Sequence, residues 1–84
     1  MERDKIILSF RWLKRGESFD LEVPLQITAN ELILGLIEGL KLPMNADDIA
    51  SCYLKAENPI ALLRGNRLLS EFGLRNGTVI NFTL

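Results

Sequence analysis

The 84-residue sequence has no histidine and a single cysteine, Cys52. Histidine is the side chain that most often serves as a general base near neutral pH and as a metal ligand, so sites of both kinds lack their commonest residue. A lone cysteine excludes an internal disulfide and is typical of a reducing compartment. We interpret Cys52 as a small buried apolar residue of a strand, because a nucleophilic thiol needs exposure and a neighbouring base.

The sequence also lacks an excess of either charge and a long hydrophobic run. Ten Lys and Arg residues stand against eleven Asp and Glu, giving a formal net charge of -1, which argues against a nucleic-acid partner. No apolar run approaches the roughly 18 residues of a membrane span, and residues 6–8 are too short for a signal-peptide core. We therefore expect a cytoplasmic protein whose residues 1–84 form one domain, with residues 1–4 as a short charged tail.

Motifs for catalysis or cofactor binding are absent as well. The adjacent carboxylates of Asp47 and Asp48 lack the ligand number and spacing of a calcium loop, so we interpret them as solvated loop charges. Glycines such as Gly65 and Gly77 are isolated turn residues, and there is no glycine-rich phosphate loop. The sequence predicts no enzyme activity, no catalytic residue, no metal and no cofactor.

The stretch from Thr28 to Leu42 predicts one long helix. Thr28 and Glu31 have the spacing of a capping box, in which each side chain accepts a hydrogen bond from the other residue's backbone N–H. We expect Lys41 in the last turn, and Pro43 prevents continuation. Apolar residues at helical spacing form one broad face: Leu32, Ile33, Leu36, Ile37 and Leu40. A helix with so wide an apolar face needs a sheet or another helix to cover it, and only strands are predicted elsewhere.

Alternation of apolar and polar residues predicts strands before and after this helix. Residues 5–13 and 18–23 form a hairpin around Gly16, and further strands are expected at 52–57, 60–63 and 78–84. Their inward-facing side chains are Ile6, Leu8, Phe10, Trp12, Phe19, Leu21, Val23, Cys52, Leu54, Ala56, Ile80, Phe82 and Leu84.

The connections after the helix are predicted from their turn residues. Residues 43–50 are expected to be an irregular loop. Leu68 and Leu69 are candidates to pair back on strand 60–63, and a single helical turn is expected to begin at Ser70 and end at Gly73. The last strand is expected beside the first, parallel and central, because both have apolar inner faces. This order predicts an α+β fold, a β-grasp with a mixed sheet of four to five strands packed on one helix.

Two stretches resemble the corresponding parts of ubiquitin: residues 19–23 (Phe-Asp-Leu-Glu-Val) before the helix and residues 66–74 before the last strand. The sequence is still more similar to the small bacterial ubiquitin-like proteins of the YukD type, encoded with type VII secretion systems of Gram-positive bacteria. The shared features are Asp-Leu-x-Val before a helix rich in Leu and Ile, and a Gly-Ile/Leu-x-Asn-Gly motif at residues 73–77. The resemblance covers nearly the whole sequence.

The resemblance implies a non-conjugated accessory or regulatory protein of a secretion system for WXG-type substrates, acting by protein–protein binding. Its partners would be protein components of the machinery, including cytosolic domains of a membrane subunit, with the protein docked at the inner face of the cell membrane. No direct membrane insertion is implied, and nothing indicates a homo-oligomer.

Ubiquitin-like modifiers and sulfur carriers act through a flexible tail ending in Gly-Gly. This sequence ends within a predicted strand, at residues 81–84, so we expect neither conjugation nor sulfur carriage. Two positions of the apolar patch of ubiquitin fall at Lys55 and Thr83, so we expect that ubiquitin receptors do not recognise it. The alternatives left open are a ubiquitin-like modifier or sulfur carrier, and an adaptor-type ubiquitin-like domain of a larger protein.

The remaining functional signal is on the surface. Arg11 and Leu13 are predicted on the outer face of the first strand, and would share that face with Asn81 and Thr83 if the first and last strands pair. Arg11 with Lys14 and Arg15 in the next turn forms one basic group. Arg64, Arg67 and Arg75 form a second basic group, and solvated charge is the simpler interpretation of each group alone. The candidate partner surface therefore comprises Arg11, Leu13, Lys55, Asn81 and Thr83, together with Leu34 on the exposed side of the helix.

Overall fold

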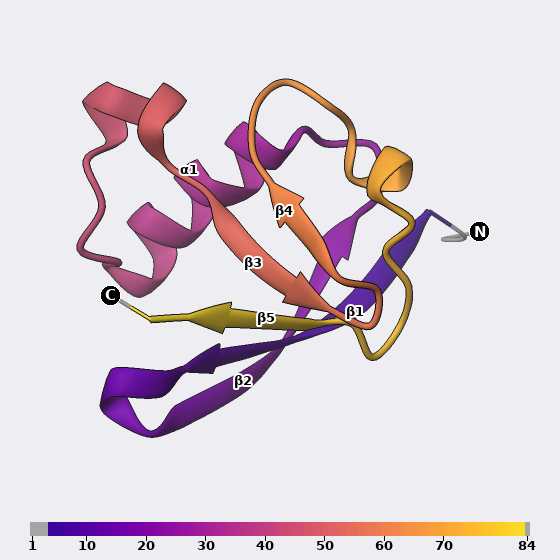
Figure 1. Cartoon of the computed structure of the whole chain (residues 1–84), viewed down its shortest axis with the longest axis horizontal. Coiled ribbons are helices and arrows are strands. Elements are labelled where there is room, and N and C mark those ends of the chain that lie inside the picture. The colour runs from indigo at the N-terminus through magenta and orange to yellow at the C-terminus, as the bar shows by residue number, and fades with distance from the viewer. Residues whose placement is uncertain (1–3, 84) are drawn as a thin grey trace.

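The computed structural model describes residues 4–83, in which a five-stranded mixed sheet is covered on one face by a helix (Figure 1). The strand order is β2-β1-β5-β3-β4. The elements in chain order are β1 (Lys5–Trp12), η1 (Leu13–Arg15), β2 (Glu17–Pro24), α1 (Ala29–Leu40), η2 (Ala46–Ser51), β3 (Leu54–Glu57), β4 (Ala61–Leu63), η3 (Leu69–Phe72) and β5 (Val79–Phe82), where η denotes a 3-10 helix. The predicted α+β arrangement is confirmed. The inward position predicted for Leu84, and the tail residues 1–3, lie outside the described part.

Strands β1 and β2 form the predicted antiparallel hairpin, paired from Lys5 with Pro24 to Trp12 with Glu17. The reversal is made by η1 and by Gly16, whose φ of 64° lies in the left-handed region that favours glycine. The predicted first strand is one residue too long, because Leu13 begins η1. The four inward residues of β1 are all buried, as predicted: Ile6, Leu8, Phe10 and Trp12.

The hairpin is buried mainly at the end nearer α1. Val23 is buried and Leu21 is half-buried, whereas Phe19 is 36% exposed. The Phe19 ring still stacks on that of Phe10, with 6.3 Å between ring centroids. All β2 residues from Glu17 to Asp20 are exposed, so the far half of the hairpin extends beyond the core.

Strand β5 lies between β1 and β3, parallel to β1 and antiparallel to β3. The register with β1 pairs Phe10 with Ile80 and Trp12 with Phe82, and these four side chains are buried. The Trp12 and Phe82 rings meet edge to face, with centroids 5.4 Å apart. Because the inner faces of both strands are apolar, the centre of the sheet lies over the core, and the predicted central parallel pair is confirmed.

Helix α1 begins at the predicted capping box. Glu31 N–H donates to Thr28 Oγ1 at 3.1 Å, and Thr28 N–H donates to the Glu31 carboxylate at 2.8 Å. Leu32, Ile33 and Leu36 are buried against the inner face of the sheet, and Figure 1 shows β3 and β4 passing in front of the helix. The prediction that Lys41 lies in the last turn is wrong. Lys41 follows the last helical residue and ends the helix, with a φ of 58°.

The chain between β4 and β5 packs against the segment that precedes α1. Leu69 N–H donates to the Ile27 carbonyl at 2.8 Å, and Leu68 forms a β-bridge with Thr28. The predicted pairing of Leu68 and Leu69 with the strand at 60–63 is therefore wrong. The Leu69 side chain is fully buried in the core, and its position there holds this segment beside the start of α1 instead of beside β4.

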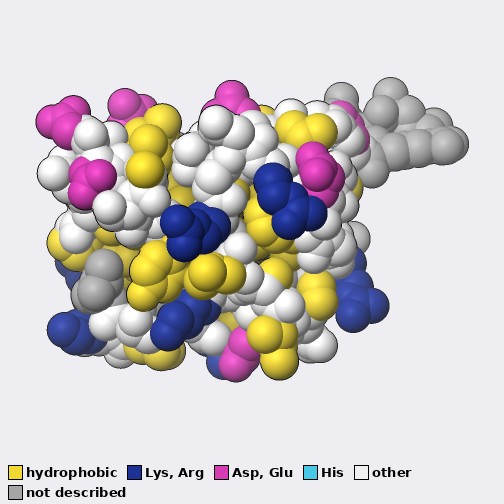
Figure 2. Space-filling model, turned by 45° about the horizontal axis from the view of Figure 1, so that its top comes forward, with side chains coloured by type: hydrophobic (Ala, Val, Ile, Leu, Met, Phe, Trp, Pro, Cys, Tyr) yellow, Lys and Arg dark blue, Asp and Glu magenta, His cyan; other side chains and the backbone are white. Residues whose placement is uncertain are grey.

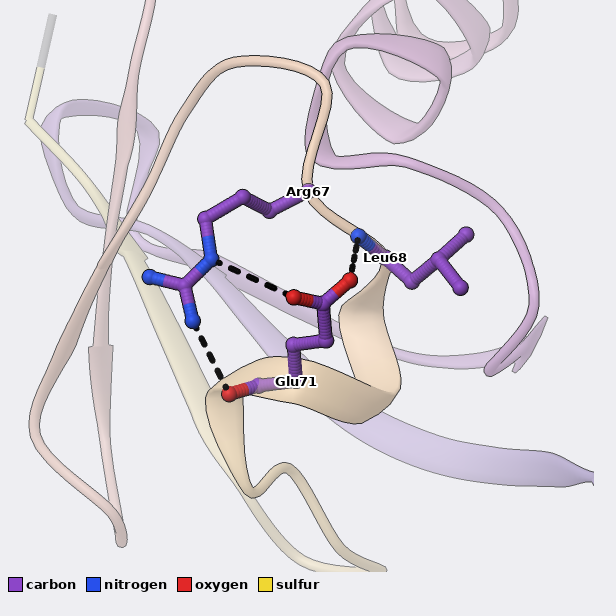
Figure 3. Close-up of polar contacts among 3 residues, drawn as sticks. All are labelled: Arg67, Leu68 and Glu71. Atoms are coloured by element: carbon purple, nitrogen blue, oxygen red, sulfur yellow. Dashed lines mark hydrogen bonds and ion pairs between the residues drawn. The ribbon is translucent and has the colours of Figure 1, made fainter.

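Helical turn η3 follows Leu68 and ends at Gly73, whose φ is 75°. The predicted stop is confirmed, but Ser70 lies inside the turn and does not begin it. The Glu71 carboxylate accepts a hydrogen bond from Leu68 N–H at 3.3 Å and so satisfies the donor at the start of the turn (Figure 3).

Short helical turns also replace the irregular loop expected after α1. Asn45 Oδ1 accepts from Asp47 N–H at 3.0 Å and begins η2. Cys52 follows η2 and is buried, with its thiol directed at the carbonyl oxygens of Asn45 and Asp48 at 3.6 and 3.5 Å. Strand β3 begins at Leu54, two residues later than predicted, because these contacts hold Cys52 to the turn.

Candidate functional site

The outer face of the sheet is the surface that α1 leaves uncovered. In β1, β5 and β3 the buried residues alternate with outward-facing ones, so the side chains between the core positions point away from the helix. Arg11 pairs with Asn81, Asn81 pairs with Lys55, and Lys55 pairs with Leu62. These four residues form a row across four neighbouring strands, which we call the outer-face row.

Three of the predicted surface residues, Arg11, Lys55 and Asn81, are thus brought together in the outer-face row. Leu13 and Thr83 lie at its margin, from η1 and from the residue after β5, and both are exposed. A shallow groove is lined by these five residues and by Ile60 and Leu62 from the β3–β4 side. Leu34 is separate: it is 37% exposed on α1, which covers the opposite face of the sheet.

A second hollow of about 270 Å³ adjoins the row on the side of η2. Its walls are the 43–53 segment and the ends of β3 and β5, including Met44, Tyr53, Lys55, Asn81 and Thr83. The sequence reasoning did not select Tyr53, Leu62 or Met44. Tyr53 and Leu62 carry a usable signal, because both alternate with buried residues in strand-like segments, whereas nothing in the pattern around Met44 places it beside β5.

The cations of the outer-face row have no acidic partner within residues 4–83. The described ion pairs lie elsewhere, at Arg15 with Glu17 (3.8 Å) and at Arg67 with Glu71 (3.6 Å). Arg11 and Lys55 are both exposed, and each flanks the uncharged amide of Asn81. Figure 2 shows Lys and Arg side chains interleaved with hydrophobic ones across the middle of one view, with most acidic side chains along the upper rim. The row therefore combines two cations with the amide of Asn81 and the apolar Leu62, and the acidic Glu57 on β3 lines the same groove.

In the second basic group, the side chain of Arg67 makes contacts within the fold. The Arg67 guanidinium contacts the Glu71 carboxylate and donates to the Glu71 carbonyl at 3.5 Å (Figure 3). It also lies 5.0 Å from the centroid of the Phe72 ring. Arg67 thus stabilises η3, and it differs from Arg11 and Lys55 in having its charge engaged.

The described residues offer no arrangement for holding a metal ion. Within residues 4–83, no three Cys, Asp or Glu side chains gather closely enough to act together as ligands. Nor does any helix in that range combine the length and apolarity required to cross a lipid bilayer.

The sequence model of one protein family matches residues 7–81, and that family is described as "WXG100 protein secretion system (Wss), protein YukD". The chain belongs to the YukD family. This confirms the resemblance drawn from residues 19–23 and 73–77 and links the chain to WXG100 secretion. No curated protein matches the sequence significantly.

Solved structures similar to this YukD protein are ubiquitin-like. One comes from work on molecular mimicry of SUMO in DNA repair, with a TM-score of 0.70 and 19% identity over 100% of this chain and 96% of that chain. A de novo designed protein based on ubiquitin has a TM-score of 0.66 and 16% identity over 94% and 87%. The C-terminal ubiquitin-like domain of mouse tubulin-specific chaperone e has a TM-score of 0.66 and 13% identity over 96% and 89%. At these identities the likeness establishes the fold alone, a ubiquitin-like β-grasp.

Proposed function

We propose that this YukD protein is a non-conjugated, non-catalytic accessory of a Gram-positive WXG100 secretion system, and that it acts by binding protein components of the machinery. The match to the YukD family over residues 7–81 carries this proposal. The proposed location is the cytoplasm, with docking at the inner face of the cell membrane through a protein partner.

The proposed binding surface is the outer face of the sheet. Arg11, Asn81 and Lys55 lie on adjacent strands, so their relative positions are fixed by backbone pairing before any partner arrives. A preformed surface of this kind binds without the entropy cost of ordering a loop. Exposed Leu13 and Leu62 add apolar contact area beside the charges.

The test is genetic complementation in a host that encodes this protein. Deletion of the gene is expected to remove most WXG100 substrate from the culture medium, and the wild-type gene to restore it. The double variant Arg11→Glu/Lys55→Glu is expected to accumulate normally but not to restore secretion. The matched control Arg64→Glu/Arg75→Glu makes the same change of charge outside the outer-face row and is expected to restore it.

Two results would contradict the proposal. Unchanged substrate secretion after deletion would remove the role in secretion. An N-terminally tagged protein that runs as a covalent ladder on denaturing gels would favour the modifier alternative instead of a binding accessory.

A further inference from the structure

We propose that the outer-face row receives an amphipathic helix that carries two acidic side chains seven residues apart, with apolar residues beside them. This inference rests on the proposed function, in which the outer face of the sheet is the binding surface, and it specifies the chemistry of the partner. The argument depends on the spacing of two cations, on the apolar residues around them and on the charges further out.

The spacing of the cations matches a helix. Arg11 and Lys55 are the neighbours of Asn81 on its two sides, so their Cα atoms are two strand spacings apart, about 9.6 Å. Two residues seven apart on one face of an α-helix are separated by about 10.5 Å along its axis. Same-face residues of an extended peptide lie about 6.7 or about 13.4 Å apart, which fits less well. A helix crossing the strands therefore aligns one carboxylate with each cation.

The exposed apolar residues of the groove lie outside the pair of cations and suit apolar residues beside the two acids. Leu13 is 53% exposed and Leu62 is 46% exposed, and both line the same groove as Arg11 and Lys55. Asn81, between the cations, is uncharged and offers both a donor and an acceptor. Residues three and four positions after the first acid lie on the same helical face and would rest over Asn81, where polar side chains can use its donor and acceptor.

Two other occupants fit the charges less well. Anionic membranes are recognised by clusters of about four to eight Lys or Arg residues, whereas the row has two. Outward-facing Glu57 lies on β3 two residues from Lys55, and Asp20 and Glu22 lie on the neighbouring β2. A second copy meeting this face symmetrically would bring the cations together, and like charges in an interface are repelled. A segment that presents two isolated acids, and not a continuous anionic surface, is the occupant that this arrangement of charges favours.

The test uses the isotopically labelled protein and a designed helical peptide with two Glu residues seven apart and Leu residues beside them on the same helical face. Titration followed by NMR is expected to perturb the backbone amides of β1, β5 and β3 and to yield a dissociation constant. Neutralising one cation, by Arg11→Gln or Lys55→Gln, is expected to weaken binding up to about fivefold. Raising the salt from about 50 to about 300 mM is expected to weaken it as well.

Charge reversal distinguishes specific pairing of the peptide charges with Arg11 and Lys55 from non-specific binding. The variant Arg11→Glu/Lys55→Glu is expected to lose the Glu peptide and to bind a peptide in which both Glu residues are replaced by Lys. The control Arg75→Glu, on the 75–78 turn, is expected to bind the Glu peptide as the wild type does. Unfolding curves of all variants establish that each is folded.

Three outcomes would overturn the inference: no binding of the Glu peptide, binding that the reversed variant retains, or binding of anionic vesicles that depends on Arg11 and Lys55 when the peptide does not bind. These outcomes leave the secretion test intact. If the reversed variant does not restore secretion and the wild type does not bind the peptide, the outer face is still supported as a binding surface. Only the proposal that its partner is an acidic helix is then rejected.

Discussion

At the scale of single residues, Thr78 is a fully buried polar side chain in the described part of the chain. Its hydroxyl donates to the Asn58 carbonyl at 2.7 Å and accepts from Arg75 N–H at 3.1 Å, joining the turn after β3 to the turn before β5. Thr78→Val keeps the shape but leaves both backbone groups without this partner. We expect the free energy of unfolding, measured by urea denaturation, to fall by about 1–3 kcal/mol.

The control for Thr78 is the same substitution at an exposed threonine. Thr83→Val is expected to change the free energy of unfolding by no more than about 0.5 kcal/mol, because Thr83 is exposed and follows β5. If Thr78→Val proved as stable as the wild type, the two hydrogen bonds would contribute nothing net to stability.

At the scale of the element, α1 contains two glycines on its exposed side, Gly35 and Gly39. A Cβ added at Gly35 would meet no other atom within 4 Å. Glycine in a helix interior is less stable than alanine because its unfolded backbone has more freedom to lose. Gly35→Ala is therefore expected to raise the free energy of unfolding by about 0.5–1 kcal/mol, measured by chemical denaturation.

Gly77 provides the opposite case for the same substitution. Its φ of 93° is a conformation that alanine rarely adopts. Gly77→Ala is expected to lower the free energy of unfolding by about 1 kcal/mol or more. Equal effects at Gly35 and Gly77 would contradict the view that backbone conformation decides the sign.

At the scale of the whole molecule, stability is expected to be uneven along the hairpin. β1 and β5 occupy inner positions of the sheet, whereas residues 17–20 of β2 are exposed and lie on an edge strand. Segments with few buried contacts open at lower free energy than the core. Hydrogen exchange followed by NMR is expected to show faster exchange for the hydrogen-bonded amides of residues 17–20 than for the amide of Ser9 in β1, which donates to the Thr78 carbonyl at 2.9 Å. Equal protection would indicate that the hairpin opens only with the whole fold.

Charge is also organised at the scale of the whole molecule. The formal net charge of -1 gives no hint of a basic surface. Arg11 and Lys55 nevertheless lie on one face because β5 places Asn81 between them, and no acidic partner within residues 4–83 neutralises them. A nearly neutral protein therefore carries, within the described residues, two unpaired cations on one face of its sheet.

Most of the fold was predictable because its signals are local. The alternation in β1, and the capping box and apolar face of α1, each involve residues a few positions apart, and all were confirmed. The errors occur where distant contacts decide. Leu69 pairs with Ile27 instead of with β4, and contacts with η2 hold Cys52 outside β3. The placement of Arg11 beside Asn81 followed from the predicted parallel pair, whereas the contribution of Leu62 required the observed register.

The sequence by itself determined the elements of this protein and which of their faces are buried, since periods of two and of 3.6 residues are properties of the local backbone. Only the tertiary structure decided how the strands are registered, and hence that Lys55 and Leu62 join Asn81 and Arg11 in one row while Leu34 lies on the opposite side. Register depends on contacts between segments far apart in the chain, and a shift by one residue would turn every side chain to the other face.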